Sequence, residues 1–260
     1  MKSEKNFFNM EKKRHVIDET AVELPVSYFD ASNLIGIFFV EPSRVNLALR
    51  GTGLSPVIQD GKAALALSFF EYRKCDLSFY NEVGLAAVVV PEGIKPPKNL
   101  YADLIRSNQN RVSSGYVLDL PVTTDEACAI GKKFWGYPKF VADISFISTG
   151  NYFQSIIKEK NSSDYIIRFS GSTGFRFPFV RMGFSTLSFL NGSVLKTSID
   201  VRTPYKISLG NSLELSLGNS KHAMADRLRS LGLGLDYKRP SFVLVNDKFQ
   251  SLLYEGKKNT

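Results

Sequence analysis

The chain has 260 residues, a length that suits one large domain or two small ones. Hydrophobic residues make up 43% and charged residues 22%, so the composition is that of an ordinary globular protein and excludes a disordered, collagen-like or low-complexity chain. The net charge of +8 is scattered along the sequence and accompanies no nucleic-acid-binding motif, so no nucleic-acid partner is expected.

The apolar runs of the sequence are short. Leu34–Val40 and Leu85–Val90 are far below the ~20 residues that a membrane-spanning helix needs. The first 20 residues carry charges throughout and lack the apolar stretch of a signal peptide. We therefore expect no membrane contact and a cytoplasmic location. Cys75 and Cys128 are far apart in sequence and predict neither a disulfide framework nor a metal site.

Residues 1–20 are predicted to form a polar N-terminal arm, in which Phe7, Phe8 and Met10 suggest a short helix. Residues 21–260 are predicted to form one domain, because no internal repeat or Ser/Gly-rich linker divides them. From Pro25 onward, short runs rich in Val, Ile, Phe and Tyr alternate with Gly, Pro, Asn and Ser, which is typical of strands separated by turns. The predicted strands are Leu34–Val40, Ala63–Phe70, Gly84–Val90, Gly115–Leu120, Phe140–Ile147, Tyr152–Ile157, Tyr165–Ser170, Pro204–Leu209 and Phe242–Val245.

Helical patterns are fewer. Thr124 is a good N-cap for a helix over Asp125–Phe134, which has acids in its first turn and lysines in its last turn, as the helix dipole favours. Lys221–Leu231 has leucines at helical spacing and a glycine after its end, and Ser43–Arg50 suits a short third helix. The sequence thus predicts a β-rich α+β fold, a barrel or bent sheet with a few flanking helices.

The motifs of several common chemistries do not occur in the sequence. His15 lies in the polar arm and is expected to be exposed, whereas His222 opens a helix and is expected to cap it or pack against it. No His/Cys pair has the spacing of metal ligands, and no phosphate-binding, dinucleotide-binding or G-x-S-x-G motif is found. We therefore expect no metal and no cofactor, and chemistry based on lysine and carboxylate groups remains.

The stretch GKKFWGYPKFVADISF (131–146) is the most unusual in the chain. It presents Lys139 among Trp135, Tyr137 and other apolar groups, where water is expected to be scarce. Desolvation disfavours a charged ammonium, and a neutral amine can attack a ketone or aldehyde to form a Schiff base. The alternative is an ordinary lysine that reaches solvent at a strand end. Strand alternation places Lys139 and Phe140 on opposite faces.

A second stretch is Tyr80–Gly84, which leads into the apolar run Leu85–Val90. Glu82 at its centre is either a solvated turn residue or an acid that faces the interior.

Taken together, these two stretches resemble the acetoacetate decarboxylase family. The resemblance is carried by Tyr80-Asn81-Glu82 and, about 50 residues later, by Gly131–Lys139, which ends in Tyr-Pro-Lys. The helical segment that begins with Lys221–Asp226 and the final Leu253-Tyr254 also resemble the family, so the similarity covers most of residues 25–255.

The resemblance implies a cone-like antiparallel β-barrel, a homo-oligomer and a cofactor-independent lyase. In such an enzyme, Lys139 condenses with a small β-keto acid such as acetoacetate in a solvent-poor pocket. Glu82 is the pocket carboxylate, which moves protons or orients the substrate. The resemblance further implies that the pocket is formed by aromatic residues that exclude water, namely Tyr80, Trp135, Tyr137 and Phe140.

The sequence departs from the family at three places. One is Ala63–Phe70, the strand before Tyr80, which lacks the acid usually found there, and Glu71 only lies nearby. Phe140 stands where a second lysine usually follows the first, and Leu34–Val40 lacks the arginine expected in the first strand. Because an arginine would recognise a substrate carboxylate, two alternatives stay open. One is a Schiff-base aldolase–dehydratase that acts on other carbonyl compounds, and the other is a non-catalytic small-molecule-binding protein of the same fold.

Overall fold

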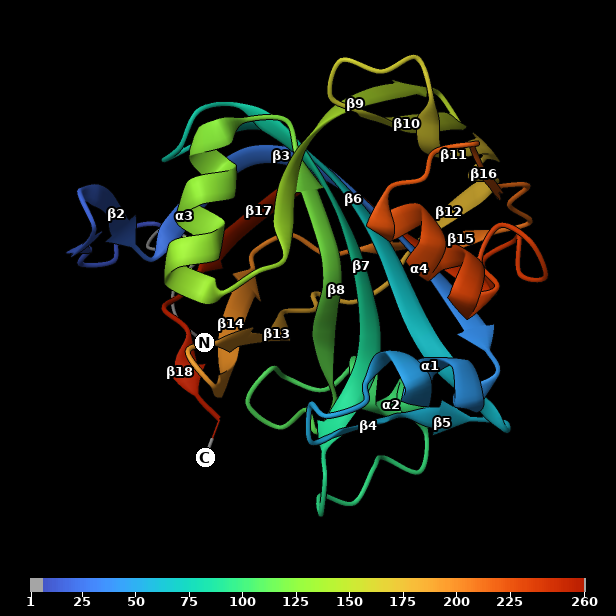
Figure 1. Cartoon of the computed structure of the whole chain (residues 1–260), viewed down its shortest axis with the longest axis horizontal. Coiled ribbons are helices and arrows are strands. Elements are labelled where there is room, and N and C mark those ends of the chain that lie inside the picture. Colours follow the sequence, from blue (N-terminus) through green and yellow to red (C-terminus); the bar gives the residue numbers. More distant parts are fainter. Residues whose placement is uncertain (1–6, 260) are drawn as a thin grey trace.

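The central feature of the fold is a closed barrel of seven strands (Figure 1). The computed structural model describes residues 7–259. The strands of the barrel are β3 (Val26–Val40), β6 (Lys62–Cys75), β7 (Tyr80–Pro91), β8 (Ser114–Val122), β13 (Phe184–Leu190), β14 (Ser193–Val201) and β17 (Phe242–Leu253). They pair in the order β8-β13-β14-β17-β3-β6-β7, and β7 pairs with β8 to close the ring. The predicted β-rich barrel is confirmed.

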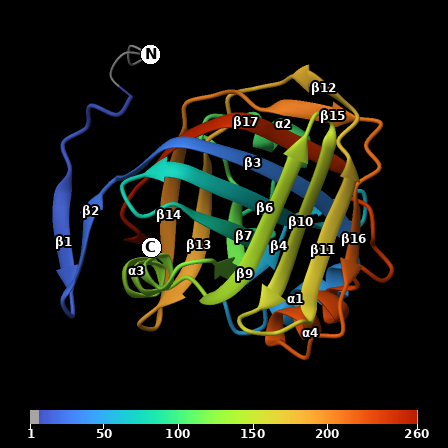
Figure 2. The ribbon, with the colours of Figure 1, turned by 90° about the horizontal axis from the view of Figure 1, so that it is seen from above.

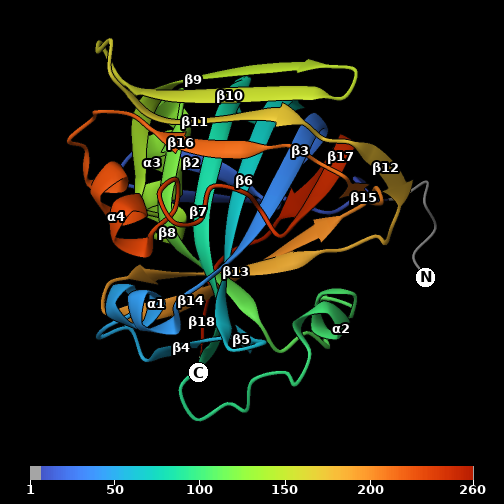
Figure 3. The ribbon, with the colours of Figure 1, turned by 90° about the vertical axis from the view of Figure 1, so that its right-hand side faces the viewer.

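Four further strands extend the sheet from β8 and form a layer against the outside of the barrel (Figure 3). They are β9 (Lys139–Thr149), β10 (Tyr152–Glu159), β11 (Tyr165–Ser172) and β16 (Glu214–Leu217). β8 and β9 pair in parallel, because α3 (Asp125–Trp135) connects them as a crossover helix. Lys139, the first residue of β9, therefore comes shortly after this helix.

The predicted helices are confirmed with small shifts at their ends, as α1 (Pro42–Ala48), α3 and α4 (Ala223–Leu231). The Thr124 side chain caps α3 by accepting a hydrogen bond from the backbone N–H of Ala127. His222 is the N-cap of α4, where its Nδ1 accepts a hydrogen bond from the N–H of Met224. None of the helices in residues 7–259 combines the length and the hydrophobicity that a membrane-spanning helix requires.

The remaining elements are short. They are α2 (Leu100–Leu104), β1 (Lys13–Ile17), β2 (Thr20–Leu24), β4 (Leu54–Pro56), β5 (Ile58–Gln59), β12 (Phe175–Pro178), β15 (Lys206–Leu209) and β18 (Lys257–Lys258).

The N-terminal region differs from the expectation. Residues 7–12 contain no helix, so the helix suggested by Phe7, Phe8 and Met10 is wrong for the part of the arm that the structure describes. β1 and β2 instead form a hairpin that projects beside α3 and spans the expected arm boundary at residue 20 (Figure 2). Lys133 of α3 holds it by donating hydrogen bonds from Nζ to the Asp18 carbonyl and to Thr20.

His15 is also less exposed than expected. It lies on β1, its ring is half-buried, and its Nδ1 lies 3.7 Å from the carboxylate of Glu255 near the C-terminus. The expectation of an exposed His15 is therefore wrong, because the hairpin packs its side chain toward the chain end.

The barrel strands are buried on both faces, and alternate residues serve two different hydrophobic clusters. On β6, Leu65, Leu67 and Phe69 face the outer layer, whereas Phe70 and Tyr72 face the barrel interior. This double burial explains why the central parts of β6 and β7 appear in the sequence as nearly continuous apolar runs.

Candidate active site

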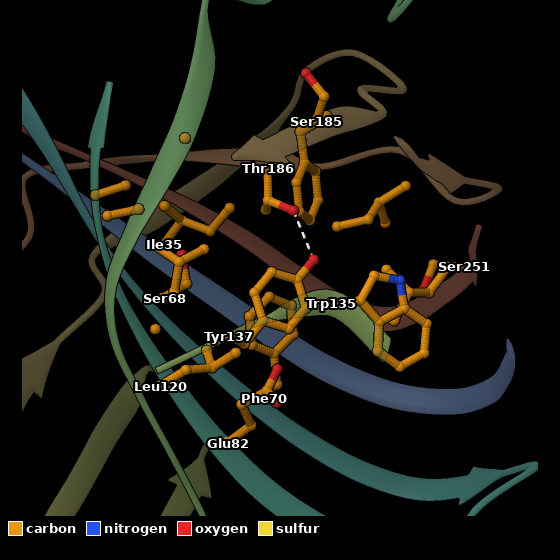
Figure 4. A pocket seen from close by; sticks show the side chains of 18 of the residues that line it. Ile35, Ser68, Phe70, Glu82, Leu120, Trp135, Tyr137, Ser185, Thr186 and Ser251 are labelled. Carbon is orange, nitrogen blue, oxygen red and sulfur yellow. Dashed lines mark hydrogen bonds between the residues drawn. The ribbon is translucent and has the colours of Figure 1, made fainter. Parts of the chain in front are cut away.

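A cavity lies inside the barrel, between α3 and the inward faces of the strands (Figure 4). It offers about 180 Å³ of space that the centre of a water molecule can occupy. A single water needs roughly 10–15 Å³ on this measure, so the cavity has room for an organic molecule of many atoms. Most of its wall is apolar, with contributions from β3, β6, β7, β8, β13 and β17.

Lys139 and Glu82 meet in this cavity. Lys139 Nζ donates a hydrogen bond to Glu82 Oε2 over 2.5 Å, and the two side chains are only 6% and 10% exposed. Glu82 reaches the interior because it lies in register with Phe70 on β6, whose ring also lines the cavity. A buried charge is costly unless it is paired, and this contact pairs the two groups.

Gly131 of α3 makes room for the lysine. A Cβ atom added at Gly131 would lie 2.4 Å from Lys139 Cδ and Cε and 3.2 Å from Nζ. The aliphatic part of the Lys139 side chain therefore packs directly on the α3 backbone at Gly131. Any larger residue at position 131 would clash with it. This contact orients the amine toward Glu82.

Three tyrosines surround the ion pair. Tyr72 donates a hydrogen bond to Glu82 Oε1 over 3.3 Å, and the Tyr28 and Tyr80 hydroxyls are 3.0 Å apart. Lys139 Nζ lies 5.6 Å from the Tyr80 ring centre, within cation–π range. The pKa values of all three tyrosines are raised well above the ordinary value, mainly by burial and further by the charge of Glu82. Their hydroxyls thus stay protonated and available as donors.

Trp135 and Tyr137 form a wall at the end of α3. Their rings stack with centres 6.1 Å apart, and Trp135 Nε1 donates a hydrogen bond to the Tyr254 carbonyl. The Tyr137 and Thr186 hydroxyls are 2.6 Å apart (Figure 4). Burial raises the pKa of Tyr137 to about 12. Gly136 lies between the two aromatic residues and ends the helix, because its backbone adopts the left-handed conformation that glycine favours.

The structure brings most of the residues predicted for the site into one cavity. Lys139, Glu82, Tyr80, Trp135 and Tyr137 all line it.

Phe140 is the exception, and the expectation that it lines the pocket is wrong. It follows Lys139 on β9 and so points to the opposite face, where its ring lies 4.2 Å from that of His222 and packs on the outer core. His222 is likewise outside the cavity, as a helix cap.

Sequence reasoning missed Tyr28, Phe70 and Tyr72. Phe70 and Tyr72 could have been found from the sequence. They are two residues apart on β6, so strand alternation places both side chains on the inward face, although the predicted strand ended at Phe70. Tyr28 lies on the first half of β3, which contains Ser, Asp and Asn and was not predicted as a strand.

Arg111 is a further cavity residue that sequence reasoning missed. It enters from the loop between α2 and β8, and its guanidinium donates hydrogen bonds to the backbone carbonyls of Asp103, Leu104, Arg106 and Gly183. Burial lowers its pKa. Among residues 7–259, no cluster of three or more His, Cys, Asp or Glu side chains is arranged to hold a metal ion.

Comparison with known proteins gives a family and a fold. The model of the family described as acetoacetate decarboxylase (ADC) matches residues 18–169, which is more than half of the chain. No match is found among curated protein sequences. Several solved structures are similar.

An acetoacetate decarboxylase from Legionella pneumophila has a TM-score of 0.67 and 16% identity, over 98% of this chain and 94% of that one. The enduracididine biosynthesis enzyme MppR, complexed with the condensation product of pyruvate and imidazole 4-carboxaldehyde, has a TM-score of 0.60 and 13% identity, over 91% and 90%. An acetoacetate decarboxylase-like enzyme from Sphingomonas wittichii has a TM-score of 0.59 and 11% identity, over 91% and 94%. At sequence identities of 11–16%, these similarities show a shared fold.

Proposed function

Because the chain belongs to the acetoacetate decarboxylase family, we propose that it is a cofactor-independent lyase whose Lys139 amine forms a Schiff base with a small β-keto acid such as acetoacetate. The observation that carries the proposal is the 2.5 Å contact between Lys139 Nζ and Glu82 inside a cavity with a largely apolar wall. A nucleophilic amine needs a nearby base and an enclosure that limits water, and this pair has both.

In the first stage, Glu82 accepts a proton from the Lys139 ammonium. The free amine then attacks the ketone carbon, a C–N bond forms, and the carbonyl electron pair moves to oxygen. The protonated Glu82 returns its proton to that oxygen and gives a hydroxyl group. The nitrogen then passes one of its two protons, through the Glu82 carboxylate, to the hydroxyl, which leaves as water and gives the iminium. Positioned proton donors and acceptors of this kind commonly speed such steps by ~10²–10⁴-fold.

In the second stage, the bond between the α-carbon and the carboxylate breaks. Carbon dioxide leaves, and the electron pair flows toward the positively charged iminium nitrogen to give an enamine. The enamine takes up a proton on carbon, and water then hydrolyses the imine to release the ketone and the Lys139 amine.

An aldol-type reaction is the second candidate. It is favoured by the lack of an arginine on β3. MppR, bound to a condensation product of pyruvate and an aldehyde, supports this reading as a similar fold. Here the Schiff base of pyruvate loses a proton from its methyl carbon to Glu82. The resulting enamine attacks the aldehyde carbon, and water is then eliminated.

The Schiff base is tested by borohydride reduction in the presence of acetoacetate or pyruvate, followed by peptide mass mapping. We expect a stable adduct on Lys139 that is lost in Lys139→Ala. Lys132→Ala is a matched control, because Lys132 is an exposed lysine on the neighbouring α3 and its removal should leave the adduct intact. The absence of any adduct, or an adduct that persists in Lys139→Ala, would refute the proposal and favour a binding protein.

The two reactions are separated by their products. Release of carbon dioxide from acetoacetate identifies the decarboxylase. Consumption of an aldehyde together with pyruvate, without release of carbon dioxide, identifies the aldolase–dehydratase.

A further inference from the structure

We propose that the substrate carries an unbranched apolar chain of several carbons beyond its reacting carbonyl, and that this chain lies in a lane of small residues leading away from Lys139. The inference rests on the proposed Schiff-base function and names the substrate class of that site. It follows from the shape and the polarity of the cavity.

The lane is formed by successive residue pairs on β6 and β7. Glu82 pairs with Phe70, next to the amine of Lys139. The next inward pairs are Ser68 with Gly84 and Ala66 with Ala86, and all four residues line the cavity. At about 3.3 Å per residue, the four steps along the chain from Glu82 to Ala86 span ~13 Å of the strand. This is several times the reach of the single methyl group that acetoacetate carries on the alkyl side of its ketone.

The small side chains keep this space open. Ala66, Ser68 and Ala86 are only half-buried although they lie in the middle of barrel strands, which means that they face an open cavity. Gly115 of β8 also lines the cavity, and it lies next to Ala86, since a Cβ atom there would be in van der Waals contact with the Ala86 Cβ at 3.5 Å. Larger residues at these positions would fill the barrel, as Phe70 does beside the ion pair.

The polar groups at the far end of the cavity are already paired. Figure 4 places Glu82 at one end of the cavity and Ser185 at the other. The Ser185 hydroxyl lies 2.7 Å from that of Ser114, and Thr186 is paired with Tyr137. The Arg111 guanidinium is bound to four backbone carbonyls. An occupant of the lane therefore meets mainly apolar surface.

The opposite direction from Lys139 suits a carboxylate. In a β-keto acid, the alkyl chain and the carboxylate-bearing carbon leave the carbonyl carbon on different sides. The pair next to Glu82 and Phe70, on the side away from the lane, is Tyr72 with Tyr80. The Tyr72 hydroxyl donates to Glu82, but the Tyr80 and Tyr28 hydroxyls share a single hydrogen bond. The second O–H of that neutral pair can therefore donate to the acid group of a substrate whose chain lies in the lane.

The test is a series of unbranched β-keto acids from acetoacetate to β-ketodecanoate. Burying a CH₂ group yields enough free energy for about a fourfold gain in kcat/KM per added carbon, until the lane is full. A profile that is flat, or that falls from acetoacetate onward, would overturn the inference.

The lane is blocked by Ala86→Leu, which should remove the chain-length gain, so that kcat/KM no longer rises from acetoacetate to the longer acids. Ser68→Val serves the same purpose if Ala86→Leu does not fold. Ala129→Leu, on the exposed face of α3, is the matched control and should keep the gain. A gain that persists in both lane variants would contradict the placement of the chain.

The failure of this inference is distinct from the failure of the proposed function. If borohydride traps acetoacetate on Lys139 but longer acids show no gain, the chain-binding inference alone is wrong. If no keto acid is trapped, the Schiff-base function is wrong. Calorimetry with decanoate then still tests the lane, with binding expected in the wild type and weakened in Ala86→Leu, whereas no binding by the wild type would refute the lane.

Discussion

The two faces of β6 and β7 differ in how they are filled. On the outer face, Leu65, Leu67 and Phe69 pack tightly, and the Phe69 ring stacks on Phe169 at 5.0 Å. On the inner face, residues such as Ala66 and Ser68 leave an open cavity. The same two strands thus supply a dense core on one side and a site on the other.

This difference shows how the barrel can hold a buried ion pair. The outer layer of β9, β10, β11 and β16 gives the strands a second hydrophobic core, so the interior is not required to be filled. A cavity and a charged pair both cost stability, and the dense outer core offsets that cost. The predictions below test this division between the two faces.

The largest expected effect is on the inner face. Glu82→Gln removes the base next to the amine and should slow Schiff-base formation with acetoacetate by ~10²–10⁴-fold, the range for a lost acid–base group. The rate is measured by borohydride-dependent adduct formation on Lys139. Glu71→Gln is the control, because Glu71 is the next residue after Phe70 on β6 but pairs with Arg73 away from the cavity. Equal rates in wild type and Glu82→Gln would contradict this role for Glu82.

Phe69→Ala should cost ~3–5 kcal/mol in the free energy of unfolding, because it opens a cavity in the dense outer core. Phe70→Ala, at the adjacent position on the inner face, should cost clearly less, since Phe70 already borders open space. Urea unfolding of both variants makes the comparison. Equal losses would contradict the difference between the two faces.

Much of the fold and of the candidate site could be predicted from the sequence. The apolar runs Ala63–Phe70 and Gly84–Val90 identified two barrel strands, and Thr124 identified the start of α3. The Tyr-Pro-Lys motif and Tyr80-Asn81-Glu82 identified the two residues that meet in the cavity.

The parts that could not be predicted depend on distant contacts. The first half of β3 contains Asn33, whose buried amide bonds to the Phe69 carbonyl and the Tyr205 hydroxyl, so a polar residue there is compatible with a strand. β13 and β14 are rich in Ser and Thr and carry a weak apolar signal. Arg111 reaches the cavity only because its loop folds over the barrel end.

A third prediction concerns Asp119 of β8, whose Oδ2 lies 2.8 Å from Nε of Arg227 in α4. Burial raises the pKa of Asp119 from 3.8 to about 6, although Arg227 opposes this shift. Between these two pH values the folded chain holds a proton that the unfolded chain has lost. The free energy of unfolding should therefore fall by about 3 kcal/mol from this group as the pH rises from about 4 to 6.

The Asp119 contribution is isolated by comparison with Asp119→Asn, which lacks the titrating group. Urea unfolding of both proteins across this pH range should give a difference that changes with pH and then becomes constant above about pH 7. A difference that stays constant throughout would show that Asp119 does not titrate in this way.

The smallest expected effect on the rate of Schiff-base formation is that of Gly131→Ala. This variant tests whether the site needs a small residue next to the Lys139 side chain. The added methyl displaces the Lys139 stem and should slow Schiff-base formation by up to ~10²-fold, as small misplacements of reacting groups do. The free energy of unfolding should change little. Alanine favours the helix by about 1 kcal/mol over glycine, and this gain offsets the cost of displacing the Lys139 side chain. Wild-type rates in this variant would mean that the lysine stem tolerates the methyl group without moving its amine.

Trp135 is the sole tryptophan of the chain, and its ring forms part of the cavity wall at 2% exposure. Intrinsic fluorescence excited at the indole band therefore reports on a single place in the molecule, which is the place where a bound compound would lie. Occupancy of the barrel can be followed by emission intensity and wavelength, without a dye, an isotope or any change to the chain.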